Sequence, residues 1–203
     1  MPALRCLTTR AAASVIVALG LTAGLAACAN DPLADQYRSG DNKGYIAGDS
    51  RWQEIPTGQR GEPVQFEGTL ETGDDVSSAD YVGDVLVVNF WYAACGPCRA
   101  EAEDLETAYG ELEGDGVSFL GINTSDSPEA ASAFADTWGV TYHSVMAADD
   151  GAVKLAFADK TPIQATPTTL VLDREGRVAA RIIGELQEAS ILTSIVRTVL
   201  EEQ

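Results

Sequence analysis

The sequence predicts an α/β domain in which a central mixed sheet is flanked by helices, and three observations support this fold class. Residues 85–91 form a continuous apolar run, which is typical of a strand buried on both faces. After that run, helical and strand patterns alternate, as they do in folds with parallel strands. Near the C-terminus, two strand patterns flank a turn at residues 174–176, which adds an antiparallel pair. The three together favour a mixed sheet.

The first helix after the apolar run is expected over about residues 99–112. Its apolar side chains recur at helical spacing and would form one face: Leu105, Ala108, Tyr109 and Leu112. A second central strand is predicted over residues 117–123. Ser127 followed by Pro128 indicates the start of another helix, because a capping serine and a first-turn proline favour that position. This helix would extend to Trp138, with Ala133, Phe134 and Trp138 facing inward.

Shorter elements complete the pattern on either side of this centre. Residues 63–70 alternate like an edge strand, and residues 76–77 would return beside it to make a hairpin. A short strand is expected over 142–146 and a small helix over 152–158. Strands over 168–173 and 177–183 form the C-terminal hairpin, and an amphipathic helix over 188–200 follows.

The N-terminus predicts an address segment rather than part of the fold. Arg5 and Arg10 precede residues 11–27, which are apolar or small throughout and are marginal in length for a membrane crossing of about 20 residues. The ending Leu25-Ala26-Ala27-Cys28 resembles a bacterial lipobox, in which the signal is cut before a cysteine that becomes lipidated. A plain signal or an uncleaved anchor is the alternative. The expected organisation is a signal over 1–27, lipidated Cys28 and a flexible tether over 28–61, and the domain over 62–203.

The charge of the chain excludes some classes of partner. The 203 residues carry a formal charge of −18, and loss of residues 1–27 would remove Arg5 and Arg10, giving −20. Nucleic-acid binding requires many Lys and Arg contacts to phosphate, so it is not expected. An electrostatic contact with anionic lipid is not expected either, and membrane attachment would depend on the lipid at Cys28.

Cys95-Gly96-Pro97-Cys98 is the motif that indicates chemistry. It lies between the strand over 85–91 and the helix that follows, and the first turn of a helix gives the Cα separation that a disulfide requires. The positive end of the helix dipole favours a thiolate, which is the nucleophile in disulfide exchange. A zinc site is the competing interpretation, but the chain has a single histidine, His143, and no second cysteine pair. We predict a redox pair that needs no metal or cofactor.

Three segments together resemble a thioredoxin fold: Phe90-Trp91, Cys95-Gly96-Pro97-Cys98 and Ala165-Thr166-Pro167-Thr168-Thr169. The hairpin before the first strand, and the extra helix and strand over residues 127–146, are similar to the membrane-anchored TlpA/ResA-like branch of the redoxins. This resemblance covers about residues 63–202. One departure is Ala94, which stands where thioredoxins usually have Trp and removes an aromatic side chain from the docking surface.

The resemblance implies roles for individual residues. Cys95, expected to be the more exposed thiol, would attack a substrate disulfide, and Cys98 would resolve the mixed disulfide. Pro167 would be cis and lie against the cysteine pair, with the backbone of Thr166 pairing with an extended substrate. The alternative for Pro167 is a proline that simply opens a strand.

Glu101 and Trp91 are the other candidate site residues. Glu101 lies three residues after Cys98 on the same helix face, where the family places a proton acceptor. The alternative is an exposed glutamate that interacts favourably with the helix dipole. Trp91 would pack beside the site, although core packing alone would also explain it.

We therefore expect a monomeric, lipid-anchored thiol–disulfide oxidoreductase on the extracytoplasmic face of the membrane. By the resemblance of its Gly-Pro dipeptide to that of thioredoxin, it would reduce protein disulfides, with apocytochrome c as one candidate substrate, and would receive electrons from a membrane partner. Two alternatives stay open: a thiol peroxidase of the redoxin type, and a non-enzymatic binding lipoprotein on a thioredoxin scaffold.

Overall fold

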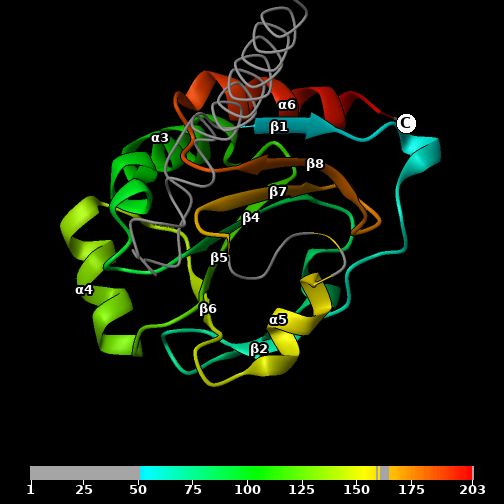
Figure 1. The fold of residues 1–203 in the computed structure, drawn as a ribbon. Coiled ribbons are helices and arrows are strands. Elements are labelled where there is room, and N and C mark those ends of the chain that lie inside the picture. Colours follow the sequence, from blue (N-terminus) through cyan, green and yellow to red (C-terminus); the bar gives the residue numbers. More distant parts are fainter. Residues whose placement is uncertain (1–50, 159, 161–164, 203) are drawn as a thin grey trace, which may run out of the picture. The chain divides into compact units, whose positions relative to one another are not determined.

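The computed structural model describes residues 51–158, 160 and 165–202, and its centre is a six-stranded mixed sheet (Figure 1). The strand order is β1-β8-β7-β4-β5-β6. β4 (Val85–Trp91) lies in the middle, parallel to β5 (Val117–Asn123) and antiparallel to β7 (Thr168–Leu172). β6 (Ser144–Met146) continues the parallel side, and β8 (Val178–Ile183) continues the antiparallel side. The predicted mixed sheet is confirmed.

Helices cover both faces of this sheet (Figure 1). On one face lie α3 (Gly96–Leu112), α4 (Pro128–Trp138) and α6 (Ala189–Glu201). The opposite face is covered by α5 (Gly151–Phe157) together with a separate hairpin of β2 (Glu67–Thr69) and β3 (Asp75–Ser77). Two short 3-10 helices, η1 (Thr57–Gln59) and η2 (Ser78–Tyr81), complete the elements.

β4 is buried on both faces, as its apolar run predicts. Val85 and Val87 pack with side chains of α3 and α6, including Leu105 and Leu192. The residues between them face the other way, where Phe90 meets Phe157 of α5 edge-on at 5.2 Å between ring centroids. Because side chains alternate along a strand, one continuous run supplies two cores and holds β4 in a single register.

The sheet extends into the segment that the sequence assigned to a flexible tether, so that assignment is wrong for residues 51–61. β1 (Arg51–Glu54) is an edge strand that pairs antiparallel with β8, from Arg51 opposite Ile183 to Glu54 opposite Ala180. Cys28 and the predicted signal over residues 1–27 lie outside the described residues. Within the described part of the chain, no helix is both long enough and apolar enough to cross a membrane.

An ion-pair network fixes the same segment to the domain. The Arg60 side chain is only 2% exposed, and its guanidinium donates to Asp173 Oδ2 at 2.9 Å and to Glu202 Oε1 at 2.8 Å. Its Nε also donates to the carbonyl of Ile55 at 3.0 Å. Arg60 therefore joins the entry of the domain to the β7–β8 turn and to the C-terminal end of α6.

Two further expectations needed correction in the helices. α3 begins at Gly96 rather than near residue 99, because the cysteine motif itself forms its first turn. In α4, Phe134 is buried as expected, but Ala133 is exposed and Trp138 is 42% exposed. The inward stripe of α4 runs through Ala131 and Phe134 instead, at helical spacing.

We expect Arg60→Ala to lower the free energy of unfolding by about 3 kcal/mol or more, because it leaves buried Asp173 without one of its partners. Arg197→Ala is the matched control, since Arg197 is 58% exposed and lies 3.8 Å from Glu111. Exposed pairs of that kind contribute about 1 kcal/mol or less. Urea unfolding measures both, and equal losses in the two variants would contradict a structural role for Arg60.

Candidate active site

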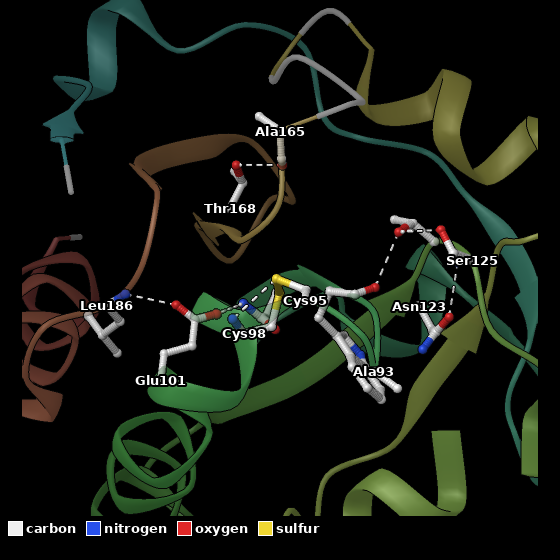
Figure 2. The surroundings of a disulfide bond; sticks show 12 residues. Ala93, Cys95, Cys98, Glu101, Asn123, Ser125, Ala165, Thr168 and Leu186 are labelled. Carbon is white, nitrogen blue, oxygen red and sulfur yellow. Dashed lines mark hydrogen bonds between the residues drawn. A yellow bond between two sulfur atoms is a disulfide. The ribbon is translucent and has the colours of Figure 1, made fainter. Parts of the chain in front are cut away.

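Cys95 and Cys98 form a disulfide at the start of α3, with an S–S distance of 2.08 Å and a Cα–Cα distance of 5.3 Å (Figure 2). Cys95 is the N-cap of α3, and Cys98 lies in its first turn. The Cys98 N–H donates to Cys95 Sγ at 3.2 Å, so the sulfur occupies the place of a capping oxygen. A negative charge at that sulfur would be stabilised by this N–H and by the helix dipole.

Both sulfurs are buried in this disulfide form, and the expectation that Cys95 is the more exposed is wrong. The exposed fraction is 0% for Cys95 and 2% for Cys98. The pair packs in a small apolar cluster with Trp91 and with Phe134 of α4. The Cys95 side chain accepts a hydrogen bond from its own helix and is buried in this cluster.

Glu101 lies one helical turn beyond Cys98 and is fully buried, with 0% exposure. Its Oε1 accepts a hydrogen bond from Asn89 Nδ2 at 2.9 Å, and its Oε2 accepts one from the Leu186 N–H at 2.7 Å (Figure 2). Burial raises the pKa of Glu101 to about 8, although the hydrogen bonds from Leu186 and Asn89 lower it. The alternative of an exposed glutamate at this position is therefore wrong.

The Asn89 side chain connects this carboxyl to the sheet. Besides Glu101, its amide nitrogen donates to Thr169 Oγ1 at 3.1 Å, and Asn89 and Thr169 are opposite each other in the β4–β7 register. Glu101 is thus held by one donor from β4 and one from the segment before α6. Its position follows from strand register and helix packing together.

The loop that precedes β7 brings Thr166 and Pro167 to the same region. The peptide bond between them is cis, as the family resemblance implies, and Thr166 is 2% exposed. Thr168 Oγ1 donates to the carbonyl of Ala165 at 3.0 Å, across the cis bond (Figure 2). β7 begins at Thr168 opposite Phe90, near the end of β4, which places this loop close to the cysteine motif.

Trp91 packs beside the cysteines, with its ring 4.4 Å from that of Phe134 between centroids. Its Nε1–H donates to Ser144 Oγ of β6 at 3.1 Å, across β5. Gly121 of β5 permits this contact, because a Cβ there would lie 2.8 Å from Trp91 Nε1 and would also collide with Ser144. The ring is therefore oriented by a specific polar contact as well as by packing.

Asp126 is a site residue that sequence reasoning missed. Its Oδ2 accepts hydrogen bonds from the Ala93 N–H at 2.6 Å and from Asn123 Nδ2 at 2.8 Å. Asn123 Oδ1 in turn accepts hydrogen bonds from the Asp126 N–H and from the Ser125 N–H, the second of which is drawn in Figure 2. This turn anchors the loop between β4 and Cys95. The predicted adjacent strands over 85–91 and 117–123 could have indicated this contact, because parallel pairing places their C-terminal ends side by side.

The described residues contain no group of three or more His, Cys, Asp or Glu side chains arranged to hold a metal ion. His143 contacts Glu71 Oε1 through Nδ1 at 2.7 Å, at the turn of the β2–β3 hairpin. That contact fastens the hairpin to the segment before β6. It does not involve the cysteine motif.

Comparison with known proteins agrees with this geometry. A family model described as Redoxin matches residues 53–200. The thiol:disulfide interchange protein HelX of Rhodobacter capsulatus is 33% identical over 113 residues, which is 56% of this chain and 60% of HelX. The thiol-disulfide oxidoreductase ResA of Halalkalibacterium halodurans is 26% identical over 119 residues, covering 59% of this chain and 65% of ResA. The chain thus matches less than two thirds of the length of these relatives.

Solved structures give the same result. A DsbF homologue from Corynebacterium diphtheriae superimposes with a TM-score of 0.64 at 30% identity, covering 75% of this chain and 96% of that one. A secreted thiol-disulfide isomerase from Corynebacterium glutamicum, at 24% identity, has a TM-score of 0.66 over 77% of this chain and 96% of its own and supports the fold. The fold is the thioredoxin fold, and the chain belongs to the redoxin family.

Proposed function

We propose that this protein is a thiol–disulfide oxidoreductase that exchanges disulfides with protein partners through Cys95 and Cys98. The single observation that supports this most strongly is a disulfide at a helix N-terminus with a fully buried carboxyl, Glu101, one turn away. HelX and ResA are named for thiol–disulfide chemistry, and the similarity to them supports the same activity here.

In the reductive direction, the reaction starts from the dithiol form. The Cys95 thiolate attacks one sulfur of a substrate disulfide, forming a mixed disulfide and releasing the other substrate sulfur as a thiolate. Cys98 then transfers its proton to the Glu101 carboxylate and attacks Cys95 Sγ. The Cys95–Cys98 disulfide forms, the second substrate sulfur leaves as a thiolate, and two electrons have passed to the substrate.

The site supports this division of roles. Cys95 Sγ is the sulfur that receives the helix N–H of Cys98, which favours a thiolate at Cys95. Glu101 has a pKa raised by burial to about 8, and a general acid or base is most effective when its pKa lies near the working pH. Cys98 lies between Cys95 and Glu101 in sequence, about one helical turn from each.

The cis-Pro167 loop is the proposed substrate-binding edge. Thr166 precedes the cis bond and would pair through its backbone with an extended substrate segment. Trp91 would pack against the cysteine pair, with its ring held in place by Phe134 and Ser144. Because Ala94 replaces the tryptophan of soluble thioredoxins, we infer that partner choice depends more on this edge than on an aromatic side chain beside Cys95.

We further propose that the protein acts outside the cytoplasm as a lipid-anchored monomer, attached through Cys28 after removal of residues 1–27. The sequence over 25–28 supports this anchor. Outside the cytoplasm a reductant needs a membrane donor of electrons to restore its dithiol. Oxidised extracytoplasmic proteins, apocytochrome c among them, are the proposed substrates.

Replacing Cys98 by Ser should trap substrates as mixed disulfides on Cys95, because no thiol remains to resolve them. The full chain with Cys98→Ser is expected to form reducible adducts visible on non-reducing gels. The Cys95→Ser/Cys98→Ser double variant controls for Cys6 and Cys28 and should form none at the site. Equal adducts in both variants would contradict exchange through Cys95, and an unchanged cellular function in the double variant would favour a binding role instead.

Glu101→Gln should remove the part of the pH dependence of exchange that has its midpoint near 8, because an amide accepts no proton. At pH 8 we expect the rate of resolution to fall by roughly 10²-fold, within the usual range for general acid–base catalysis. Exposed Glu103→Gln is the matched control on the same helix and should leave the profile unchanged. Insulin reduction followed from pH 5 to 9 measures both, and identical profiles would rule out proton transfer by Glu101.

The reductive direction predicts a low reduction potential for the Cys95–Cys98 couple. By analogy with other Cys-Gly-Pro-Cys couples, we expect a value near that of thioredoxin, about −270 mV. Equilibration of the purified protein with glutathione buffers measures it. A potential above about −180 mV would show that the protein oxidises its partners or isomerises their disulfides.

A further inference from the structure

A small cavity lies between β4 and α3, beside Cys98. Its volume is about 10 Å³, and Asn89, Cys98 and Tyr142 are among the residues that line it. A single buried water needs about 10–15 Å³ measured in this way. The rest of the lining is apolar and includes Trp91 and Phe134. The cavity is therefore the right size for one water molecule, with polar groups in its wall.

Two of those polar groups have no hydrogen-bond partner among the described residues. The Asn89 amide nitrogen donates to Glu101 and Thr169, which leaves Asn89 Oδ1 as an unused acceptor. The Tyr142 ring packs against Phe119 at 5.6 Å between centroids, but its hydroxyl donates to no described side chain or carbonyl. Asn89 is 3% exposed and Tyr142 is 9% exposed. Buried polar groups of this kind are normally satisfied by protein or by ordered water.

Tyr142 lines the same small cavity as Cys98, and its hydroxyl is close enough to Glu101 to be influenced by the charge of that carboxyl. Burial raises the pKa of Tyr142, and the next largest contribution is the charge of Glu101. Tyr142 is thus a protonated hydroxyl, and a hydrogen-bond donor, over the whole range in which thiols titrate. A donor and an acceptor that line one water-sized space beside Cys98 define a binding site for a bridging water.

We propose that this cavity is a hydration site, in which one water accepts a hydrogen bond from Tyr142 Oη and donates to Asn89 Oδ1 and, in the dithiol form, to the Cys98 thiolate. Three hydrogen bonds are typical of a buried water. Tyr142 is then a positioning residue, which acts on Cys98 through the water. The inference rests on the proposed exchange function, because it concerns the thiolate that resolves the mixed disulfide.

The charged and titratable groups around Cys98 are few. α3 contributes Glu101, whose own charge is influenced by Glu185 and Asp104. The segment before β6 contributes Tyr142, whose hydroxyl is also influenced by the charge of Glu106 on α3. The residues of β4 and α4 that line the cavity do not titrate. A hydrogen bond to a thiolate lowers the pKa of its thiol. Loss of the bridging water should therefore raise the pKa of Cys98 without removing any neighbouring charge.

Tyr142→Phe in the full chain tests this directly, in a Cys95→Ser background that leaves Cys98 as the thiol at the site. We expect the midpoint for alkylation of Cys98, followed by mass spectrometry of its peptide, to move up by about one pH unit. Tyr109→Phe is the matched control, because Tyr109 belongs to the same aromatic cluster and lies outside the cavity lining. An unmoved midpoint in Tyr142→Phe, or an equal shift in Tyr109→Phe, would overturn the proposal.

A second measurement does not require the Tyr142→Phe variant. In the unchanged chain, NMR should detect magnetisation transfer from a long-lived water to protons of Tyr142 or Cys98, and its absence would overturn the hydration site even if Tyr142→Phe failed to fold. Neither experiment uses a protein substrate. A chain that reduced no protein disulfide would refute the exchange function, and these two measurements would still decide the hydration site.

Discussion

The carboxyl of Glu101 is held beside the disulfide by donors from two distant parts of the chain, the Asn89 side chain on β4 and the Leu186 N–H before α6. A buried carboxylate is costly unless it is hydrogen-bonded, and Glu101 accepts two hydrogen bonds while burial raises its pKa to about 8. The same packing that supplies these donors, β4 against β7 and α6 against α3, also shapes the domain. The fold of the domain and the proposed chemistry thus depend on the same two hydrogen bonds to the buried Glu101 carboxyl.

Around this contact, the site is assembled from segments that end at one edge of the sheet. β4 leads into the cysteine motif, the turn after β5 anchors the loop before Cys95 through Asp126, and the cis-Pro167 loop leads into β7. The register of β4 is fixed because both of its faces are buried, and this also fixes where the cysteine motif begins. The proposed redox pair therefore directly follows a strand that is buried on both faces.

The sequence was sufficient for the elements whose signals are local. β4 and β5 follow from apolar runs, α4 from its Ser127-Pro128 start, and the cysteine motif from its spacing. Contacts made over long sequence separations were not predictable: the polar edge strand β1 is stabilised by β8, and buried Arg60 is matched by Asp173 and Glu202. Glu101 was identified through family resemblance, whereas one of its two hydrogen-bond donors, the Leu186 N–H, lies 85 residues away. Asp126 was missed because its partner is the backbone of Ala93.

The pKa of Glu101 in the folded protein decides whether its carboxyl can act as the proton acceptor for Cys98. The most direct measurement is the ¹³Cδ chemical shift of Glu101, followed by NMR from pH 4 to 10 in the disulfide form, with Glu101→Gln used for assignment. A titration midpoint near 8 is expected, because burial outweighs the two hydrogen bonds. A midpoint near the ordinary value of about 4.5 would contradict the account of Glu101 as the proton acceptor for Cys98.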